Sequence, residues 1–353
     1  MPYFKNYIAE KKGFSHSRRE PGPDFLLSVI LSFRNESAVI PELISRLKAA
    51  IEPIGVRYEL LFINDDSTDN SIEILKQESK HNQNIRVIDM SRRFGVTSCI
   101  MAGLRFSMGD AAVLMDADLQ DPPELIPEML KQFKAQTADL VYTVRLSREG
   151  ENPIKMAITR LAYQLIKRFG GVNIEVNAGA FKLMSRRMVN CILQLQEREP
   201  FMKGLLHWPG FKQVVVHYHR EPRFAGNAKF PILGTLNPAR EFLSGMTSFT
   251  GFPLKMTLML GFLLAALGFV YFGVILGMYI NGTNMPGWTT IVGFILIFGA
   301  SHLITIGIVG LYVGRIYNDV KKRPLYFVKD TMGYEQIDSE IAQHKLGNDS
   351  LSV

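Results

Sequence analysis

The chain is 353 residues long, with 47% hydrophobic residues, 21% charged residues and a formal net charge of +7. It has no zinc-ligand spacing, no RNP-like aromatic motif and no long Lys/Arg run, which argues against a nucleic-acid-binding protein. Its two cysteines, Cys99 and Cys191, lie far apart and suit a reducing cytosolic setting without a disulfide framework. The basic balance suits a surface that meets anionic lipid headgroups or phosphorylated substrates.

Residues 1–24 are polar and charged and end in a Pro-Gly-Pro break, so we expect a surface tail and not a signal peptide. From residue 26, apolar runs alternate with helix-like segments. The runs cover 26–33, 58–64, 85–90, 111–116 and 139–144, and the helix-like segments cover 37–51, 69–80, 96–106 and 122–133. This rhythm predicts an α/β fold with a doubly wound sheet, in which ligands bind at the carboxyl ends of the strands.

The pattern after residue 150 is less regular. A helical pattern reaches 167, a mixed segment covers 177–184, a further helix covers 187–196, and an alternating strand lies within 211–223. We therefore expect one catalytic domain over residues 25–235, followed by an amphipathic segment, 236–252, that lies in the membrane interface.

Two uncharged stretches indicate membrane spans. Residues 256–280 and 289–314 contain no Asp, Glu, Lys or Arg, and each exceeds the roughly 20 residues needed to cross a bilayer. A pair of buried core helices is the alternative interpretation. We expect two transmembrane helices within 253–317 and a cytosolic tail over 318–353. The connection 281–288 has no Lys or Arg, whereas both outer flanks are basic, so the positive-inside rule places the catalytic domain and the C-terminus in the cytosol.

The sequence MDADLQDPPE, at Met115–Glu124, carries the strongest chemical signal. Asp116 and Asp118 follow an apolar strand, so both carboxylates lie at the rim of the sheet. There, with Gln120, they can hold Mg²⁺ or Mn²⁺, which take oxygen ligands and often share phosphate oxygens. A metal at this place would neutralise charge on a departing diphosphate. Two solvated loop carboxylates are the alternative, and the apolar strand before them argues against it.

Further motifs follow in order, among them SFRNE (Ser32–Glu36), NDDSTD (Asn64–Asp69), SRRFG (Ser91–Gly95) and RFAGNAKF (Arg223–Phe230). With these, residues 26–328 resemble the family 2 glycosyltransferases of GT-A (Rossmann-like) fold. The resemblance is to their polyprenyl-phosphate branch, which includes dolichol-phosphate mannose synthase and bacterial bactoprenol-phosphate glucosyltransferases. It implies a GT-A catalytic domain with a C-terminal anchor of two transmembrane helices.

The resemblance also implies site residues. The metal site would comprise Asp116, Asp118 and Gln120, and both aspartates and Arg145 would be catalytic. Arg145 and Arg160 would hold the acceptor phosphate, because a guanidinium can bind two phosphate oxygens at once. The donor nucleotide would be bound by Ser32, Arg34, Glu36, Asp65, Asp66, Arg93, Arg223 and Lys229.

The implied reaction is an inverting, metal-dependent transfer of a sugar from a nucleotide-sugar, with UDP-glucose as the first expectation. The acceptor would be a polyprenyl phosphate of the undecaprenyl type, and the lipid-phosphate-sugar product would be used across the membrane. The expected location is the bacterial plasma membrane, as a multi-pass protein. A homo-oligomer is compatible with this interpretation, and we expect no nucleic acid among the partners.

Two alternatives stay open. A processive polysaccharide synthase resembles the same catalytic domain but carries Gln-x-x-Arg-Trp, and neither Trp208 nor Trp288 follows an arginine. A catalytically weak membrane scaffold is suggested by Ala180, because relatives usually have an acidic residue before the phenylalanine that here is Phe181. The presence of all the expected metal and phosphate residues argues against the scaffold.

Overall fold

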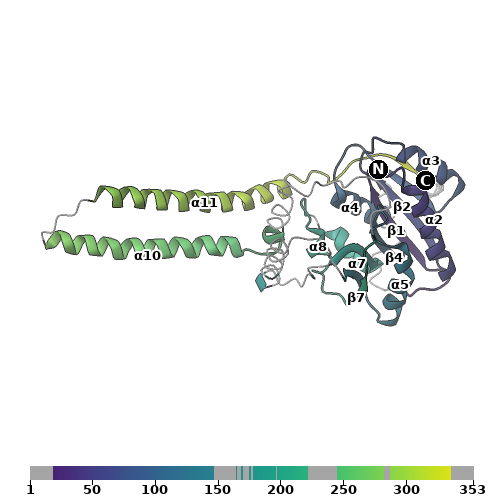
Figure 1. The fold of residues 1–353 in the computed structure, drawn as a ribbon, viewed down its shortest axis with the longest axis horizontal. Helices are drawn as coiled ribbons and strands as arrows, with labels where there is room; N and C mark the ends of the chain where they lie inside the picture. Colours follow the sequence, from purple (N-terminus) through teal and green to yellow (C-terminus); the bar gives the residue numbers. More distant parts are fainter. Residues whose placement is uncertain are drawn as a thin grey trace, which may run out of the picture.

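The computed structural model describes residues 19–146, 164, 168–169, 175, 178–195, 197–221, 245–281 and 287–334. It places a sheet flanked by helices beside two long helices that run side by side away from it (Figure 1). Seven of the eight strands of this sheet lie within residues 25–235, the range expected for the catalytic domain, and the eighth, at 328–332, lies outside it. Arg160, Arg223 and Lys229 lie outside the described residues.

One mixed sheet of eight strands forms the centre of the domain, in the order β7-β5-β6-β4-β1-β2-β3-β8. Strands β1 to β4 are mutually parallel, β6 is antiparallel to both β4 and β5, and β7 is parallel to β5. Strands β1 to β5 and β7 therefore end at the same edge of the sheet, which we call the carboxyl edge. The strands are β1 (Leu26–Phe33), β2 (Arg57–Asn64), β3 (Ile85–Met90), β4 (Ala111–Asp116), β5 (Leu140–Arg145), β6 (Ala178–Ser185), β7 (Gln213–Tyr218) and β8 (Val328–Met332).

Helices cover both faces of the sheet, which explains why its central strands are nearly continuous apolar runs. The first core joins α2, α3 and α5 to residues such as Leu27 and Val29 of β1. The second joins α4, α7 and α8 to the opposite face, with Ile30 of β1. The helical elements of the domain are α2 (Ile40–Ile51), η1 (Glu52–Ile54), α3 (Ser71–His81), α4 (Val96–Phe106), η2 (Pro123–Leu125), α5 (Ile126–Ala135), α7 (Arg186–Gln194) and α8 (Met202–Leu205).

Three expected helices begin later than the sequence pattern indicates, among them α3, which begins at Ser71 and not at 69. Helix α2 begins at Ile40 and not at 37, and the backbone N–H groups of Glu36 and Ser37 before it donate to Ser71 Oγ and to the carboxylate of Asp69. The segment that starts at Pro122 first forms the short 3₁₀-helix η2, and α5 follows it. Most of the mixed segment 177–184 belongs to the strand β6, which ends one residue later at Ser185.

The expected tail over 318–353 needs correction. Helix α11 (Trp288–Val320) extends past residue 318, and β8 pairs with β3 as an antiparallel edge strand of the sheet. The sequence of β8, VKDTM, is polar, and most of the strand is at least partly exposed, so no apolar alternation marks it. The chain therefore returns to the catalytic domain after its last long helix.

Two helices are long and apolar enough to cross a membrane: α10 (Phe252–Ile280) and α11 contain candidate spans with mean hydropathy 2.4 and 2.2. No residue in either apolar window is buried, so buried core helices do not fit these segments. The two helices contact each other, with the rings of Tyr271 and Phe294 4.5 Å apart. Residues 245–249 of the expected interfacial segment are helical, and 236–244 lie outside the described residues.

Candidate active site

The acidic turn that follows β4 lies at the carboxyl edge. Asp116 ends β4 and pairs in register with Ser32 of β1. Leu119, buried, has a φ of 58°, and this left-handed residue folds the turn back so that Gln120 N donates to Asp118 Oδ1 at 3.2 Å. The Gln120 carbonyl accepts from Glu221 N at 3.1 Å. The turn that carries both aspartates is thus fixed from within and from the segment that follows β7.

Several carboxylates converge at this turn. Burial, followed by the negative charges of Asp121 and Asp118, raises the pKa of Asp116 to about 6. Asp121 is fully buried, and burial raises its pKa as well. Its Oδ1 accepts from the Tyr218 hydroxyl, while its buried Oδ2 has no hydrogen-bond partner among the described residues.

A hard cation fits this cluster, because it would offset the mutual repulsion of one buried carboxylate, Asp121, and two that are partly exposed, Asp116 and Asp118. Within the described residues, no group of three or more His, Cys, Asp or Glu side chains could hold a metal ion by itself. Asp116, Asp118 and Gln120, the expected metal-binding residues, do lie together on one turn.

Arg145 is linked to the acidic turn through a tyrosine. It ends β5, pairs in register with Tyr218 of β7, and donates from Nε to the Tyr218 hydroxyl at 3.3 Å. Burial disfavours the charge on Arg145, but the bond to Tyr218 and the nearby Asp121 and Asp116 outweigh burial and raise its pKa. Burial, followed by Asp121, raises the pKa of Tyr218 to about 12, so the phenol keeps its proton and can donate to Asp121.

Sequence reasoning overlooked Tyr218 and Asp121. Asp121 belongs to the acidic motif and could have been noticed there. Tyr218 ends an alternating strand at the same edge as Arg145, but only the sheet order reveals that β7 lies next to β5.

The loops after β1 and β2 are joined by hydrogen bonds. Asn35 donates from its backbone N to Ser67 Oγ at 2.9 Å and accepts from Thr68 N at 2.8 Å. Arg34 Nε donates to the Asp66 carbonyl at 3.3 Å. These contacts bring Ser32, Arg34, Glu36, Asp65 and Asp66 to one part of the carboxyl edge, with Glu36 and Asp65 buried and Asp66 exposed.

Asp65 also holds the segment after β3 in place. Its carboxylate accepts hydrogen bonds from the backbone N–H groups of Phe94 (2.6 Å) and Gly95 (3.1 Å). It therefore anchors the SRRFG segment after β3, which carries the exposed Arg93. The expected contact of Asp65 with the donor stays a prediction, as do the roles of the other residues at this edge.

Ala180 lies at the beginning of β6 and is exposed there.

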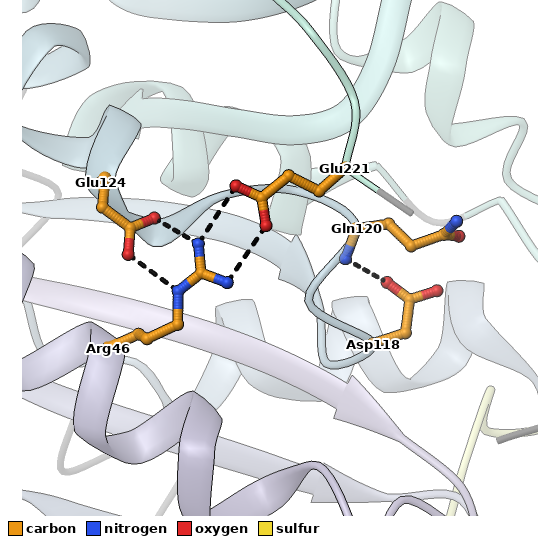
Figure 2. Close-up of polar contacts among 5 residues, drawn as sticks. All are labelled: Arg46, Asp118, Gln120, Glu124 and Glu221. Carbon is orange, nitrogen blue, oxygen red and sulfur yellow. Dashed lines mark hydrogen bonds and ion pairs between the residues drawn. The ribbon is translucent and has the colours of Figure 1, made fainter. Parts of the chain in front are cut away.

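An arginine on α2 joins η2, which follows the acidic turn, to the segment that follows β7. Figure 2 shows Arg46 between two carboxylates, close to the turn that carries Asp118 and Gln120. Arg46 Nε and Nη2 donate to Glu124 at 2.8 and 2.7 Å, and Nη1 donates to Glu221 at 3.1 Å. These bonds to two carboxylates raise the pKa of Arg46. Because Glu221 N also bonds to the Gln120 carbonyl, Arg46 braces both sides of the acidic turn.

Comparison with known proteins assigns the chain to a family. The profile described as "Glycosyl transferase family 2" matches residues 28–193. The "Uncharacterized glycosyltransferase YkcC" of Bacillus subtilis (strain 168) is 38% identical over 309 residues, which cover 87% of this chain and 94% of that protein. The chain belongs to glycosyltransferase family 2.

Other similar proteins of this family have more specific names. The "Prophage bactoprenol glucosyl transferase homolog" of Escherichia coli (strain K12) is 35% identical over 304 residues, covering 86% of this chain and 98% of that protein. A crystal structure of glucosyl-3-phosphoglycerate synthase from Mycobacterium tuberculosis is 20% identical, with a TM-score of 0.45, and covers 64% of this chain and 80% of that one. The predicted α/β fold class is confirmed, as a glycosyltransferase family 2 domain built on one mixed sheet and followed by two long apolar helices.

We expect Arg46→Gln to lower the kcat/KM of this glycosyltransferase by about tenfold, equivalent to about 1.4 kcal/mol of barrier. Without Arg46, Glu124 and Glu221 face each other unpaired and the acidic turn loses its brace. Both glutamates are partly exposed, so the loss of folding stability should stay near 1 kcal/mol. Steady-state kinetics and thermal unfolding measure the two effects. Lys131→Gln, which removes an exposed cation that pairs with Glu128, is the control. Equal activity in both variants would show that Arg46 does not support the site.

Proposed function

We propose that this glycosyltransferase moves a sugar, with UDP-glucose as the first candidate donor, onto a polyprenyl phosphate of the undecaprenyl type. The observation that carries the proposal is the chain of contacts from Arg145 through Tyr218 to Asp121, beside the Asp116–Gln120 turn. These contacts hold two kinds of group at the carboxyl edge. Arg145 is a cation for an acceptor phosphate, and the aspartates are carboxylates for a metal–diphosphate complex. The names of the bactoprenol glucosyl transferases, 35% identical to this chain, support the acceptor class.

The donor would lie over the loops after β1, β2 and β3. Arg34, Asp66 and Arg93 are positioned there by the hydrogen bonds between the loops, with Ser32, Glu36 and Asp65 beneath them. Arg223 and Lys229 are proposed to add cations at the donor phosphates. Arg160 is proposed to assist Arg145 at the acceptor phosphate.

Asp116, Asp118 and Gln120 would hold Mg²⁺ or Mn²⁺ together with diphosphate oxygens. The metal, when bound, supplies a positive charge that stabilises the departing diphosphate. The chain's own contribution is to keep these oxygen ligands at the end of a buried strand, on a turn fixed by the bonds to Gln120.

The proposed reaction is a single displacement. An oxygen of the lipid phosphate forms a bond to the anomeric carbon, the bond from that carbon to the diphosphate oxygen breaks, and the nucleoside diphosphate leaves with the bonding electrons. The configuration is inverted. A phosphate monoester has a second pKa near 6 and is largely dianionic at pH 7, so no protein base has to remove a proton. Arg145 holds the attacking phosphate, and Tyr218 orients Arg145.

Two membrane spans suit a lipid acceptor. Helix α10 leads away from the domain and α11 leads back to it, so a headgroup in the bilayer surface would be held near the catalytic domain. This placement reduces the entropic cost of bringing the two substrates together.

Turnover of several nucleotide-sugars on a short-chain polyprenyl phosphate tests the proposal. We expect UDP-glucose to be consumed only when the lipid phosphate is present, with formation of a lipid-phosphate-sugar. Repeated addition of sugars to one growing chain would favour the processive synthase. No transfer from any donor would favour the scaffold.

We expect the catalytic domain and the C-terminus to lie in the cytosol. The segment 281–288 between the helices has no Lys or Arg, whereas Lys321, Lys322 and Arg323 follow α11 directly. A phosphatase fused after Val353 should be inactive, because this enzyme is active only outside the cytosol, whereas a fluorescent protein that matures in the cytosol should be bright there. The opposite pair of results would refute this orientation.

A further inference from the structure

We propose that a pocket at the junction of α11 and the catalytic domain binds the phosphate group of an anionic phospholipid. The pocket has a volume of about 220 Å³, well above the space that a single water needs. Its lining includes Arg198, Lys321 and Arg323, with Glu199 as the single acidic residue and Ser98 of α4 on the domain side. Three cations and one anion give the lining a formal charge of +2. This binding does not depend on the sugar or the acceptor proposed above.

The pocket offers an unused donor. Arg198 Nε is buried and has no hydrogen-bond partner among the described residues. The Arg198 backbone is fixed, because its N–H donates to Asp319 Oδ1 at 2.9 Å. Glu199 offsets only one of the three positive charges, and its carboxylate accepts from Asn318 Nδ2 at 2.8 Å. Because Arg198 lines the pocket, a phosphate oxygen there would accept charge-assisted hydrogen bonds from its guanidinium.

The pocket also lies at the height of lipid headgroups. The apolar candidate span in α11 ends at Val320, and Lys321 and Arg323 follow immediately. Lys321 Nζ lies 3.8 Å from the centre of the Tyr317 ring, an aromatic residue at the end of the span. Tyrosine at this position is typical of the membrane–water interface. Phospholipid phosphates that surround α11 are thus beside the pocket.

A bound phosphate would join the membrane helix to the donor side of the site. Ser98 belongs to the first turn of α4, which follows Gly95, and Gly95 N donates to Asp65. On the other side of the pocket, the segment after Arg323 reaches Phe327, whose carbonyl accepts from Ser91 N at 3.0 Å. The pocket therefore connects the end of α11 to both ends of the SRRFG segment, and we expect phospholipid binding to increase sugar transfer by holding that segment.

Lys322 provides a matched control for the test. It lies between Lys321 and Arg323, is exposed, and does not line the pocket. Lys322→Gln and Arg323→Gln each remove one charge at the same depth, so both lose the same general attraction to an anionic membrane. A difference between them reports on the pocket.

The full chain would be purified in nanodiscs of phosphatidylcholine, with or without phosphatidylglycerol, and the retained lipids identified by native mass spectrometry. We expect Arg323→Gln to retain phosphatidylglycerol about tenfold less than Lys322→Gln does, which corresponds to about 1.4 kcal/mol. Equal retention in the two variants would overturn the proposal. Binding of inorganic phosphate or polyprenyl phosphate in the pocket, without phosphatidylglycerol, would overturn it as well.

Activity gives a second readout. Phosphatidylglycerol should stimulate transfer by the wild type and by Lys322→Gln, while Arg323→Gln should keep its activity in phosphatidylcholine and lose the stimulation. If the wild type transfers no sugar in any lipid, the proposed function fails. The lipid-retention result still decides the fate of the pocket, because it requires no turnover.

Discussion

Asp118→Asn is expected to lower sugar transfer by about 10³-fold or more while leaving the fold intact. A neutral amide is a much poorer ligand for a hard cation than a carboxylate. Loss of a metal's Lewis-acid contribution removes several kcal/mol of transition-state stabilisation, and about 4 kcal/mol corresponds to a thousandfold in rate. The asparagine side chain still has an Oδ1 that can accept from Gln120 N, so the turn itself should persist.

The measurement is kcat/KM with saturating Mg²⁺ or Mn²⁺, together with thermal unfolding to verify the fold. EDTA should stop the wild-type enzyme, and added metal should restore it. Glu78→Gln makes the same carboxylate-to-amide change near the C-terminal end of α3, toward the opposite edge of the sheet, and should leave activity unchanged. Wild-type-like turnover by Asp118→Asn in the presence of metal would remove Asp118 from the proposed metal site.

The core strands could be predicted from the sequence because both faces of the sheet are covered. Leu27 and Ile30 of β1 pack into different cores, so the strand is apolar throughout and easily recognised. β8 could not be predicted, because it is an edge strand that is mostly open to solvent. The place of β6 was also hidden, because this strand lies between β4 and β5, which follow each other in the chain.

The site shows the same division. The position of Asp116 and Arg145 at the carboxyl edge could be predicted because each ends a recognisable strand, while their roles stay proposals. The contacts that position them join residues far apart in sequence: Tyr218 and Asp121 are separated by 97 positions, and Arg46 and Glu221 by 175. No local periodicity encodes such pairs. They depend on which strands become neighbours, and that is decided by the packing of the whole sheet.

Arg145→Ala is expected to lower kcat/KM for the lipid phosphate by about 10²-fold to 10³-fold, with little change in the affinity for the nucleotide-sugar. Hydrogen bonds from a guanidinium to a phosphate are charge-assisted and about twice as strong as neutral ones. Two such bonds at about 1.5–3 kcal/mol each account for the expected loss. Because Nε is already directed to Tyr218, the two Nη groups are the ones that we expect to meet the phosphate.

Arg145→Lys separates charge from geometry. Lysine keeps the positive charge but offers one ammonium in place of a planar pair of donors, and it has no Nε to bond to Tyr218. We therefore expect it to recover at most about a tenth of the lost activity, about 1.4 kcal/mol short of full rescue. Arg57→Ala, at the start of β2 and hence at the opposite edge of the sheet, is the control for loss of an arginine. Kinetics for both substrates and direct binding of the nucleotide-sugar are measured for each variant. A large loss of donor affinity in Arg145→Ala, with acceptor use unharmed, would place this arginine on the donor and would leave the acceptor phosphate without its principal cation.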